Sequence, residues 1–315
     1  RAPVGDAFVD MTASCVACRA CATACPSSVT FGRLMEGSRQ AIAGRAVPWW
    51  QRLAYRTLEH PRLLAGLTAA GGAAQRAGLV PGRVADRLSL PRLPVRREPL
   101  RPTGTDVWLL TGCVMDAWQR PVHRATIAVL GAMGVGVALP GPAAACCGAL
   151  HSHAGLHERA AGLARRVMGA FPGDAPVLVD SAGCGAAMKE YDRLLGTAEA
   201  ARFVTRVFDV QEWIAGRADA LPPARPGRPR PRIAVQDPCH LRHVQRAEAS
   251  VRTVLRPYGE LVELTDEGRC CGAGGSYSSL QPELAGRIRA EKVAVIHRAR
   301  ADVVASPNHG CAMWL

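Results

Sequence analysis

Lysine is almost absent from this chain of 315 residues, since Lys189 and Lys292 are its only two copies. The formal net charge of +13 therefore comes almost wholly from arginine, in a sequence also rich in alanine, glycine and proline. This composition resembles a genome-wide bias more than a nucleic-acid-binding surface, because the positive charge is dispersed along the chain. We expect no nucleic-acid partner. The surplus still favours an acidic partner or an anionic membrane face.

Several functional motifs are also missing. No G-x-G-x-x-G follows a strand candidate, and no nucleophile lies beside a candidate base, so the sequence predicts no catalytic residue in this chain. Residues 125–150 contain no charged side chain, but glycines and prolines such as Gly134 and Pro140 interrupt them too often for a membrane span. We expect a helix, a turn, a strand and a loop there.

Cysteine, in contrast, organises the whole sequence. Its twelve copies form three sets of four with none left over. The first set is a C-x2-C-x2-C-x3-C-P run, the ligation signature of bacterial ferredoxins, in which a short loop of thiolates holds an iron–sulfur cluster. The visible sequence has no secretory segment, which favours reduced, metal-bound thiolates in the cytosol over a disulfide framework. We expect an electron carrier with a 4Fe–4S cluster at Cys15, Cys18, Cys21 and Cys25.

The other eight cysteines form two copies of one pattern: a cysteine, then Cys-Cys-Gly, then a last cysteine. The copies lie about 125 residues apart. Within a copy, 32 or 30 residues separate the first cysteine from the pair, and 36 or 39 separate the pair from the last. No local loop joins ligands so distant, so the fold must bring them together. These candidate metal ligands are Cys113, Cys146, Cys147 and Cys184, and Cys239, Cys270, Cys271 and Cys311.

Both copies also share one order of expected elements, with strands and helices in alternation. This alternation predicts an α/β fold of parallel units, in which ligands collect at the carboxyl ends of the strands. Because each cysteine position follows a strand candidate, we expect each foursome to meet at one sheet edge. The strands are expected at 107–110, 135–139 and 177–180 and at 233–235, 261–264 and 302–305, and the helices at 121–133 and 156–170 and at 244–256 and 282–299.

Four thiolates suit either a 4Fe–4S cluster or a closed tetrahedral zinc site, and ligand softness does not choose between them. We expect Gly148, directly after a cysteine pair, to let the backbone pass close to the metal. Four histidines near the cysteines are candidates to bind a metal or to tune it, and we favour tuning or exposure to solvent. These are His151, His153, His240 and His309.

Residues 31–100 carry helical patterning, with Trp49, Trp50 and Leu53 on one side and arginines interleaved. This amphipathic stripe suits a membrane surface or, as we favour, packing on its own protein or on a partner subunit. Proline-rich stretches at 90–102 and 221–232 predict extended linkers. The expected domains are a ferredoxin-type segment at 1–30, a helical linker region at 31–102, a first repeat at 103–218, a proline- and arginine-rich linker at 219–232 and a second repeat at 233–315.

Three stretches carry a resemblance to a known family: residues 181–191, Cys146-Cys-Gly-Ala149 and the ending Asn308-His-Gly-Cys311. With these, both repeats resemble the cysteine-rich CCG domain of heterodisulfide reductase. The same domain occurs in the iron–sulfur subunits of glycolate oxidase, lactate-utilisation and anaerobic glycerol-3-phosphate dehydrogenase complexes. Among these the glycolate oxidase iron–sulfur subunit is the most similar, over nearly the whole chain.

The sequence departs from this pattern at two points. The longer form of the domain motif ends in C-x2-C, but Ala187 and Trp314 stand at that offset. This difference argues against noncubane disulfide chemistry and favours a plain electron relay or a structural metal. The family also carries two ferredoxin-type runs, of which this chain has one. Because the fourth cysteine of such a run serves the other cluster, we expect the missing run upstream of Arg1, in a chain truncated at both ends.

The resemblance implies an electron-transfer subunit. A partner FAD subunit would oxidise glycolate to glyoxylate, and the clusters of this chain would pass the electrons toward quinone or another membrane acceptor. Such a protein would be cytoplasmic, or peripheral on the inner membrane. The alternatives are a lactate or glycerol-3-phosphate dehydrogenase subunit, an enzyme that reduces disulfides, and zinc-stabilised repeats that only dock a partner.

Overall fold

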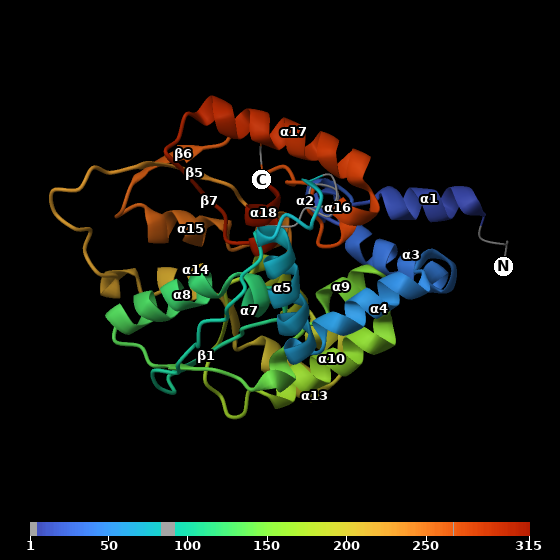
Figure 1. Ribbon diagram of the computed structural model, residues 1–315, viewed down its shortest axis with the longest axis horizontal. Coiled ribbons are helices and arrows are strands. Elements are labelled where there is room, and N and C mark those ends of the chain that lie inside the picture. The colour runs from blue at the N-terminus through green and yellow to red at the C-terminus, as the bar shows by residue number, and fades with distance from the viewer. Residues whose placement is uncertain (1–4, 83–91, 267) are drawn as a thin grey trace.

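The computed structural model describes residues 5–82, 92–266 and 268–315. Figure 1 shows two α/β lobes, one in green and yellow and one in orange and red, with a helical N-terminal part in blue beside them. The predicted α/β class with parallel sheets is confirmed. None of the described helices has the length and apolar character needed to cross a bilayer.

The first repeat is built on a parallel sheet with the strand order β2-β1-β3-β4. Side chains alternate between its two faces: Val107 and Leu109 pack toward α8 and α14, and Val177 packs toward α10. Strand β4 was not predicted. The elements are β1 (Val107–Leu109), α7 (Val114–Trp118), α8 (Arg120–Ala132), β2 (Val137–Ala138), η1 (Pro142–Ala144), α9 (Ala149–His153), α10 (His157–Gly169), β3 (Val177–Val179), α11 (Ala182–Met188), α12 (Tyr191–Leu195), α13 (Ala198–Val204), β4 (Val207–Asp209), α14 (Val210–Ala215) and η2 (Ala218–Ala220).

The second repeat has a smaller parallel sheet with the order β6-β5-β7, so β5 takes the central place that β1 holds in the first. The helix expected at 244–256 is wrong in its first part. A π-helix precedes it and ends at Arg246, whose positive φ of 54° breaks the helix. The elements are β5 (Arg232–Val235), η3 (Leu241–Gln245), α15 (Glu248–Leu255), β6 (Glu260–Glu263), α16 (Tyr277–Leu280), α17 (Pro282–Ala299), β7 (Val303–Ala305) and α18 (His309–Trp314).

The N-terminal part is helical, as its patterning predicted. Prolines separate its long helices: Pro48 caps α4, and Pro61 is the first residue of α5. The expected linker at 90–102 has no helix or strand from Arg92 onward, and its first two residues lie outside the described ranges. The elements are α1 (Asp6–Ser14), α2 (Ala20–Ala24), α3 (Phe31–Ala46), α4 (Trp49–Leu58) and α5 (Pro61–Arg76).

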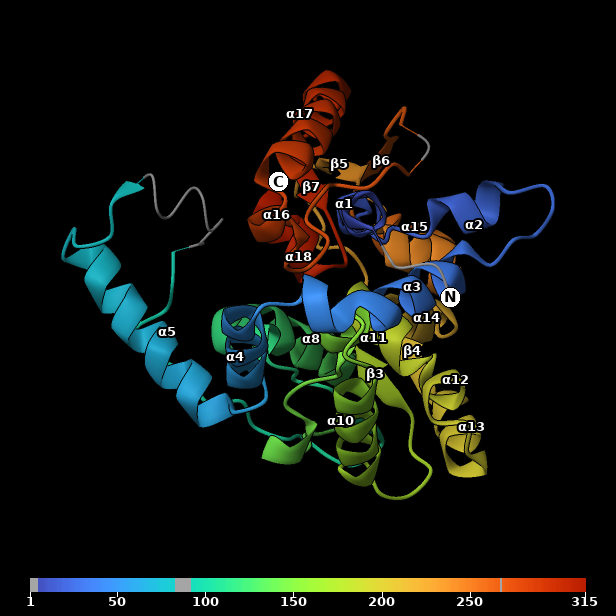
Figure 2. The same cartoon turned by 90° about the vertical axis from the view of Figure 1, so that its right-hand side faces the viewer.

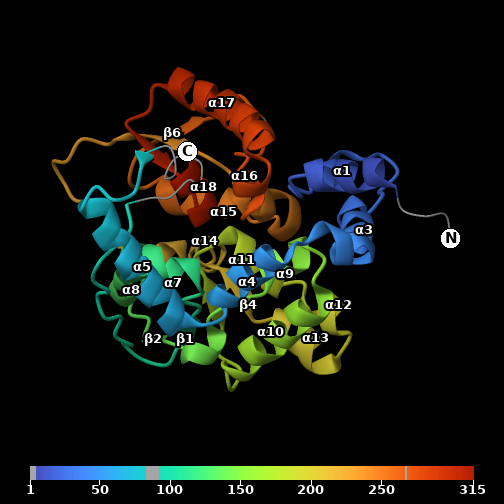
Figure 3. The same cartoon turned by 45° about the vertical axis from the view of Figure 1, so that its right-hand side comes forward.

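Helices α1–α3 lie on the side of the molecule where the two repeats meet (Figures 1 and 3). Tyr277 of the second repeat donates to the Ser14 carbonyl at 2.7 Å, and the Arg19 guanidinium donates to Glu190 of the first repeat at 3.0 Å. The expected ferredoxin-type segment is thus bound to both repeats. Helix α5, in contrast, projects at the margin of the molecule (Figure 2).

The repeats contact each other through the segments that carry their last cysteines. The Ala182 amide donates to the Pro307 carbonyl at 3.1 Å, and the Gly183 amide donates to the Asn308 side chain at 3.2 Å. Gln245 of η3 adds a bond from its amide nitrogen to the Ala182 carbonyl at 2.9 Å. The duplicated sequence therefore forms two lobes whose cysteine-bearing edges face one another.

Candidate metal centres

In the first repeat, the four cysteines follow the carboxyl ends of three strands and converge. Cys113 follows β1, the Cys146–Cys147 pair follows β2, and Cys184 lies in α11 after β3. The thiol of Cys113 forms a hydrogen bond with Cys146, and Cys147 forms one with Cys184. The predicted gathering of this foursome at one sheet edge is what the structure shows.

The second repeat repeats this arrangement. The Sγ atoms of Cys239 and Cys270 lie 4.0 Å apart, and those of Cys271 and Cys311 lie 3.0 Å apart. In both repeats, then, the first cysteine pairs with the first member of the Cys-Cys dipeptide and the last cysteine pairs with the second. This shared order follows from the equivalent places of β1 and β5 in their sheets.

Five of these eight cysteines are buried, whereas Cys113, Cys184 and Cys239 are half-buried, and their protonation reflects this environment. The bond to Cys146, followed by burial, raises the pKa of Cys113 well above its usual range, while the same bond lowers that of Cys146 to about 5. The bond to Cys184 and burial likewise raise the pKa of Cys147. Four thiolates do not persist together in such a pocket without a cation, because buried like charges repel one another.

Within the described residues, no group of three or more histidine, cysteine or acidic side chains already has the geometry that holds a metal ion. A zinc–sulfur bond of about 2.3 Å places two tetrahedral ligands about 3.8 Å apart, so the 3.0 Å pair in the second repeat is a hydrogen-bonded thiol pair that would have to separate to hold either zinc or a cluster. As a donor set, four convergent sulfurs fit a thiolate-held metal or cluster. Such a group would displace the thiol protons and supply one-electron chemistry or a structural link.

The glycine after each cysteine pair serves the fold in a different way from the one expected. Gly148 has a φ of +82°, and a Cβ there would lie 3.2 Å from the Ala160 carbonyl oxygen of α10. Gly272 has a φ of +90°, and a Cβ there would lie even closer to α17, 2.7 Å from the Ala285 carbonyl oxygen. The close approach that requires glycine is therefore to the next helix, which presses the cysteine pair onto its lobe.

The N-terminal cysteines lie on the loop between α1 and α2 and on α2 itself. Cys15 ends α1, Cys21 lies in α2, and Cys25 ends α2. Burial raises the pKa of Cys18, and the sulfurs of Cys239, Cys15 and Cys21 act in the same direction. Cys15, Cys21 and Cys239 of the second repeat therefore lie near enough to Cys18 to act on its charge, and the cluster site at the N-terminal cysteines stays a prediction.

Three of the four histidines contact a cysteine or each other, and the fourth, His309, contacts Ser181. His240 Nδ1 lies 3.4 Å from Cys239 Sγ, and the His240 and His153 rings are 5.2 Å apart between centroids. His151 helps to lower the pKa of Cys146, after the larger contribution of Cys113. Burial lowers the pKa of His309 to about 4, so this ring is neutral at physiological pH and bonds Ser181 at 2.9 Å. These contacts suit a tuning role.

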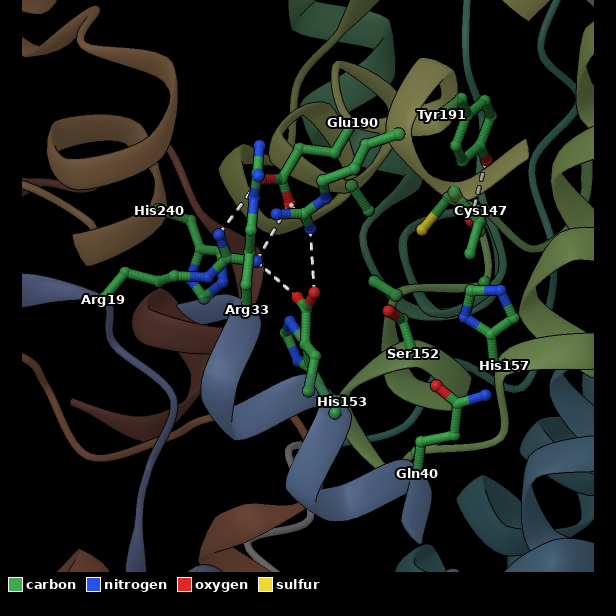
Figure 4. A pocket seen from close by; sticks show the side chains of 18 residues that line it. Arg19, Arg33, Gln40, Cys147, Ser152, His153, His157, Glu190, Tyr191 and His240 are labelled. Carbon is green, nitrogen blue, oxygen red and sulfur yellow. Dashed lines mark hydrogen bonds and ion pairs between the residues drawn. The ribbon is translucent and has the colours of Figure 1, made fainter. Parts of the chain in front are cut away.

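Sequence reasoning missed the polar groups that hold the sites in place. Arg19 donates to Glu190 at 3.0 Å and Arg193 donates to Glu36 at 2.9 Å, which ties the N-terminal loop and α3 to the first repeat. The buried Tyr191 hydroxyl donates to the Cys147 carbonyl at 2.7 Å (Figure 4). Their partners are up to 171 residues away in the chain, so no local motif identifies them.

A cavity of about 250 Å³ lies beside the first foursome. Figure 4 shows Cys147 on one side of it and Arg19, His153 and His240 on the other. Ala187, which stands where the longer family motif has its last cysteine, is among the residues that line it. The cavity therefore touches residues beside all three cysteine sets, since Arg19 follows Cys18 and His240 follows Cys239.

Comparison with known proteins agrees with this geometry. The chain is 29% identical to the probable glycolate oxidase iron-sulfur subunit of Bacillus subtilis and 29% identical to the glycolate oxidase iron-sulfur subunit of Escherichia coli, each over 96% of this chain and 76% of the relative. It is also 30% identical to one subunit of the fumarate reductase (CoM/CoB) of Methanothermobacter marburgensis, over 64% of this chain and 40% of that one. The model of the cysteine-rich domain matches residues 107–189 and again 233–315. The chain therefore belongs to the cysteine-rich (CCG) domain family and carries two copies of the domain.

Proposed function

We propose that this chain is the iron–sulfur electron-transfer subunit of a glycolate oxidase complex. A partner FAD subunit oxidises glycolate to glyoxylate, and this chain takes up the electrons and passes them toward the quinone pool. Its relatives are iron–sulfur subunits of an oxidoreductase at modest identity, which supports the general class. Lactate utilization protein A of Geobacillus thermodenitrificans, 26% identical over 66% of this chain, keeps a lactate complex as the alternative substrate class.

The observation that carries this proposal is the placement of the three cysteine sets. Each foursome of the repeats converges in the same pairing order, and Cys18 of the N-terminal set lies near Cys239 of the second repeat. The segments that bear Cys184 and Cys311 also contact each other through Asn308. A set of adjacent sulfur-lined sites is what successive one-electron transfers need, because transfer is fast only between close centres. The chain itself supplies no substrate site in this proposal.

The test is metal analysis and EPR of the full chain after anaerobic reconstitution, compared with variants. We expect iron and sulfide at the repeats, and Cys147→Ser and Cys271→Ser should each remove the signal of one repeat. Two zinc ions per chain, with no iron at the repeats, would instead make them docking modules. Co-expression with an FAD subunit, followed by glycolate-dependent reduction of the EPR signals, would identify the substrate.

The N-terminal site has its own test, because its first three cysteines are proposed to share one cluster and Cys25 to serve another. In the full chain reconstituted alone, Cys21→Ser should lower the iron bound there, whereas Cys25→Ser, its matched control at the residue that follows α2, should not. A fully ligated cluster that depends on Cys25 in this chain would contradict the proposal.

One observation favours a second candidate, an enzyme that reduces disulfides. The cavity in Figure 4 gives a small molecule access to the Cys147 region of the first repeat. The absence of a cysteine at Ala187 argues against it, since the fifth thiolate of the longer motif is missing. Disulfide-dependent oxidation of the reduced chain, without any flavoprotein, would support this candidate over an electron relay.

A further inference from the structure

The described residues enclose a second, more apolar cavity, of about 310 Å³, at the other side of the N-terminal cysteine loop. It lies among α1, α3 and α4 of the N-terminal part and α16 of the second repeat. Its volume is within the range of pockets that hold small organic ligands, about 300–1,000 Å³. Its lining includes Thr12, Cys15, Arg39, Ala46, Trp50, Gln51, Tyr55 and Ser276.

The cavity contains a small number of buried polar groups that are ready to donate hydrogen bonds. Gln51 donates to the Tyr55 hydroxyl at 2.9 Å, and the Tyr55 and Ser276 hydroxyls are 2.5 Å apart. Whichever of these two hydroxyls donates to the other, one O–H hydrogen of the pair is left for another acceptor. The Thr12 side chain is only 1% exposed, and its hydroxyl has no partner among the described residues. Two separate donors thus face a mostly apolar space.

The charges around the cavity favour an uncharged ligand. The only cation that lines it, among the described residues, is Arg39. Its guanidinium is already used by main-chain carbonyls: it donates to His153 at 2.9 Å, to Thr12 at 3.3 Å and to Cys15. No carboxylate is among the described lining residues. A ligand with carbonyl oxygens and no net charge suits this set of donors better than an anion does.

The cavity borders a surface suited to lipid. Trp50 lines the cavity and is 50% exposed, and on the same helix α4 Trp49 is 75% and Leu53 54% exposed. The stripe therefore does not pack on its own protein, and of the expected alternatives a partner subunit and a membrane surface stay predictions. Glu36 and Glu59 are the only acids between residues 31 and 82, and both are paired with arginine. Exposed tryptophans beside an excess of positive charge match the boundary of an anionic leaflet.

We propose that this cavity binds the ring of a lipid-soluble quinone, with the Thr12 hydroxyl and the Tyr55–Ser276 pair donating to its two carbonyl oxygens. The proposal rests on the proposed function, because the electrons come from the reduced centre at the Cys15 loop, which forms one wall. A cluster held by the Cys15 loop would supply two electrons, one at a time, and the quinone would take up two protons from solvent, one at each carbonyl oxygen, to give the quinol. The partner subunit would supply the electrons that replace them.

Binding to the full chain tests this site, with ubiquinone-1 as the probe and titration calorimetry as the measurement. Ala46→Phe at the end of α3 fills the cavity and should weaken binding at least about tenfold, because the ring loses its space. Thr12→Val keeps the shape of the side chain but removes its hydroxyl donor, and it should weaken the binding of ubiquinone-1 about tenfold. Ala41→Phe, exposed on the same helix and outside the cavity, is the matched control and should bind like the wild type.

Lack of saturable binding to the wild type, or equal binding by all four proteins, would overturn the proposal. So would displacement of ubiquinone-1 by glutathione disulfide at equal concentration, since that would make the cavity a disulfide site. Circular dichroism melts establish whether each variant is folded. If Ala46→Phe does not fold, the binding of ubiquinone-1 by Thr12→Val decides whether the cavity is the site. Iron content and EPR of the same samples distinguish failure of the quinone site from failure of the proposed function. In the second case, the two repeats and the Cys15 loop would hold no iron.

Discussion

The bond from Tyr191 to Cys147 offers a sharp test of how the first cysteine site is held. Tyr191 is only 1% exposed, and its hydroxyl donates to the Cys147 carbonyl at 2.7 Å. In Tyr191→Phe the carbonyl keeps its burial and loses this donor, so the variant should lose about 1–3 kcal/mol of unfolding free energy. The loop that carries Cys147 should also loosen, which we expect to speed the reaction of that repeat's thiols with a disulfide reagent.

Tyr258 provides a matched control for this prediction. Its hydroxyl donates to the Pro222 carbonyl over the same distance, 2.7 Å, but the side chain is half-buried and lies on no cysteine loop. Water can replace that bond, so Tyr258→Phe should cost less than about 1 kcal/mol and leave thiol reactivity unchanged. Urea unfolding and the rate of thiol modification are the measurements. Equal losses in the two variants, with equal reactivity, would refute the reasoning from burial.

Three further predictions concern other parts of the fold. Burial raises the pKa of Asp209 to about 7, against about 3.9 in the unfolded chain, so the folded state favours the protonated acid. The free energy of unfolding should therefore fall as the pH rises from about 4 to 7. The difference in unfolding free energy between the wild type and Asp209→Asn should change by about 4 kcal/mol over that window, and a constant difference would contradict the assignment. Gly155→Ala should lower the free energy of unfolding by more than about 4 kcal/mol, because its Cβ would lie 2.4 Å from the Arg39 main chain at a φ of +78°. Its control, Gly162→Ala, places a Cβ in open space on α10 and should leave the thermal melting temperature unchanged or slightly higher. Glu59→Gln should lower the free energy of unfolding, measured in urea, by about 1–2 kcal/mol. This is less than the loss of a fully buried ion pair costs, because Arg159 is half exposed and keeps its hydration. An unchanged free energy would mean that the pair does not stabilise α4.

Much of the fold of the repeats was predictable because it depends on local pattern. Short apolar runs such as 107–110 and 177–180 become buried strands, and the helix at 282–299 is found at the predicted residues. The charge-free stretch at 125–150 forms the helix, strand and turn that its glycines and prolines indicated. Strand β4 (Val207–Asp209) escaped prediction because three residues carry too little periodicity, and only its pairing with β3 makes it a strand.

The candidate sites were predictable as sets of cysteines but not as geometry. The duplicated order of the sulfurs implied that the fold gathers them, and it does. The sequence does not show which polar side chains lie around the cysteines. Arg39, for example, donates to the carbonyl of Cys15, 24 positions earlier in the chain, and the Tyr55 hydroxyl bonds Ser276, 221 positions later. Such contacts depend on how α3 and α4 pack between the repeats, which no periodicity within either helix encodes.

The two repeats are equivalent in their sulfur pairing but not in their contact with each other. At the start of the last-cysteine helix the first repeat has Ser181, and the second has Asn308 at the matching place. The Asn308 side chain accepts from the Gly183 amide at 3.2 Å and donates to Cys311 Sγ at 3.3 Å, so one amide joins the helix start of one repeat to a sulfur of the other. The segment that positions Cys184 is therefore hydrogen-bonded to the residue that contacts Cys311. Together with the bonds from the Ala182 amide to Pro307 and from Gln245 to Ala182, this contact joins the two copies of one sulfur-binding lobe through residues that differ between them.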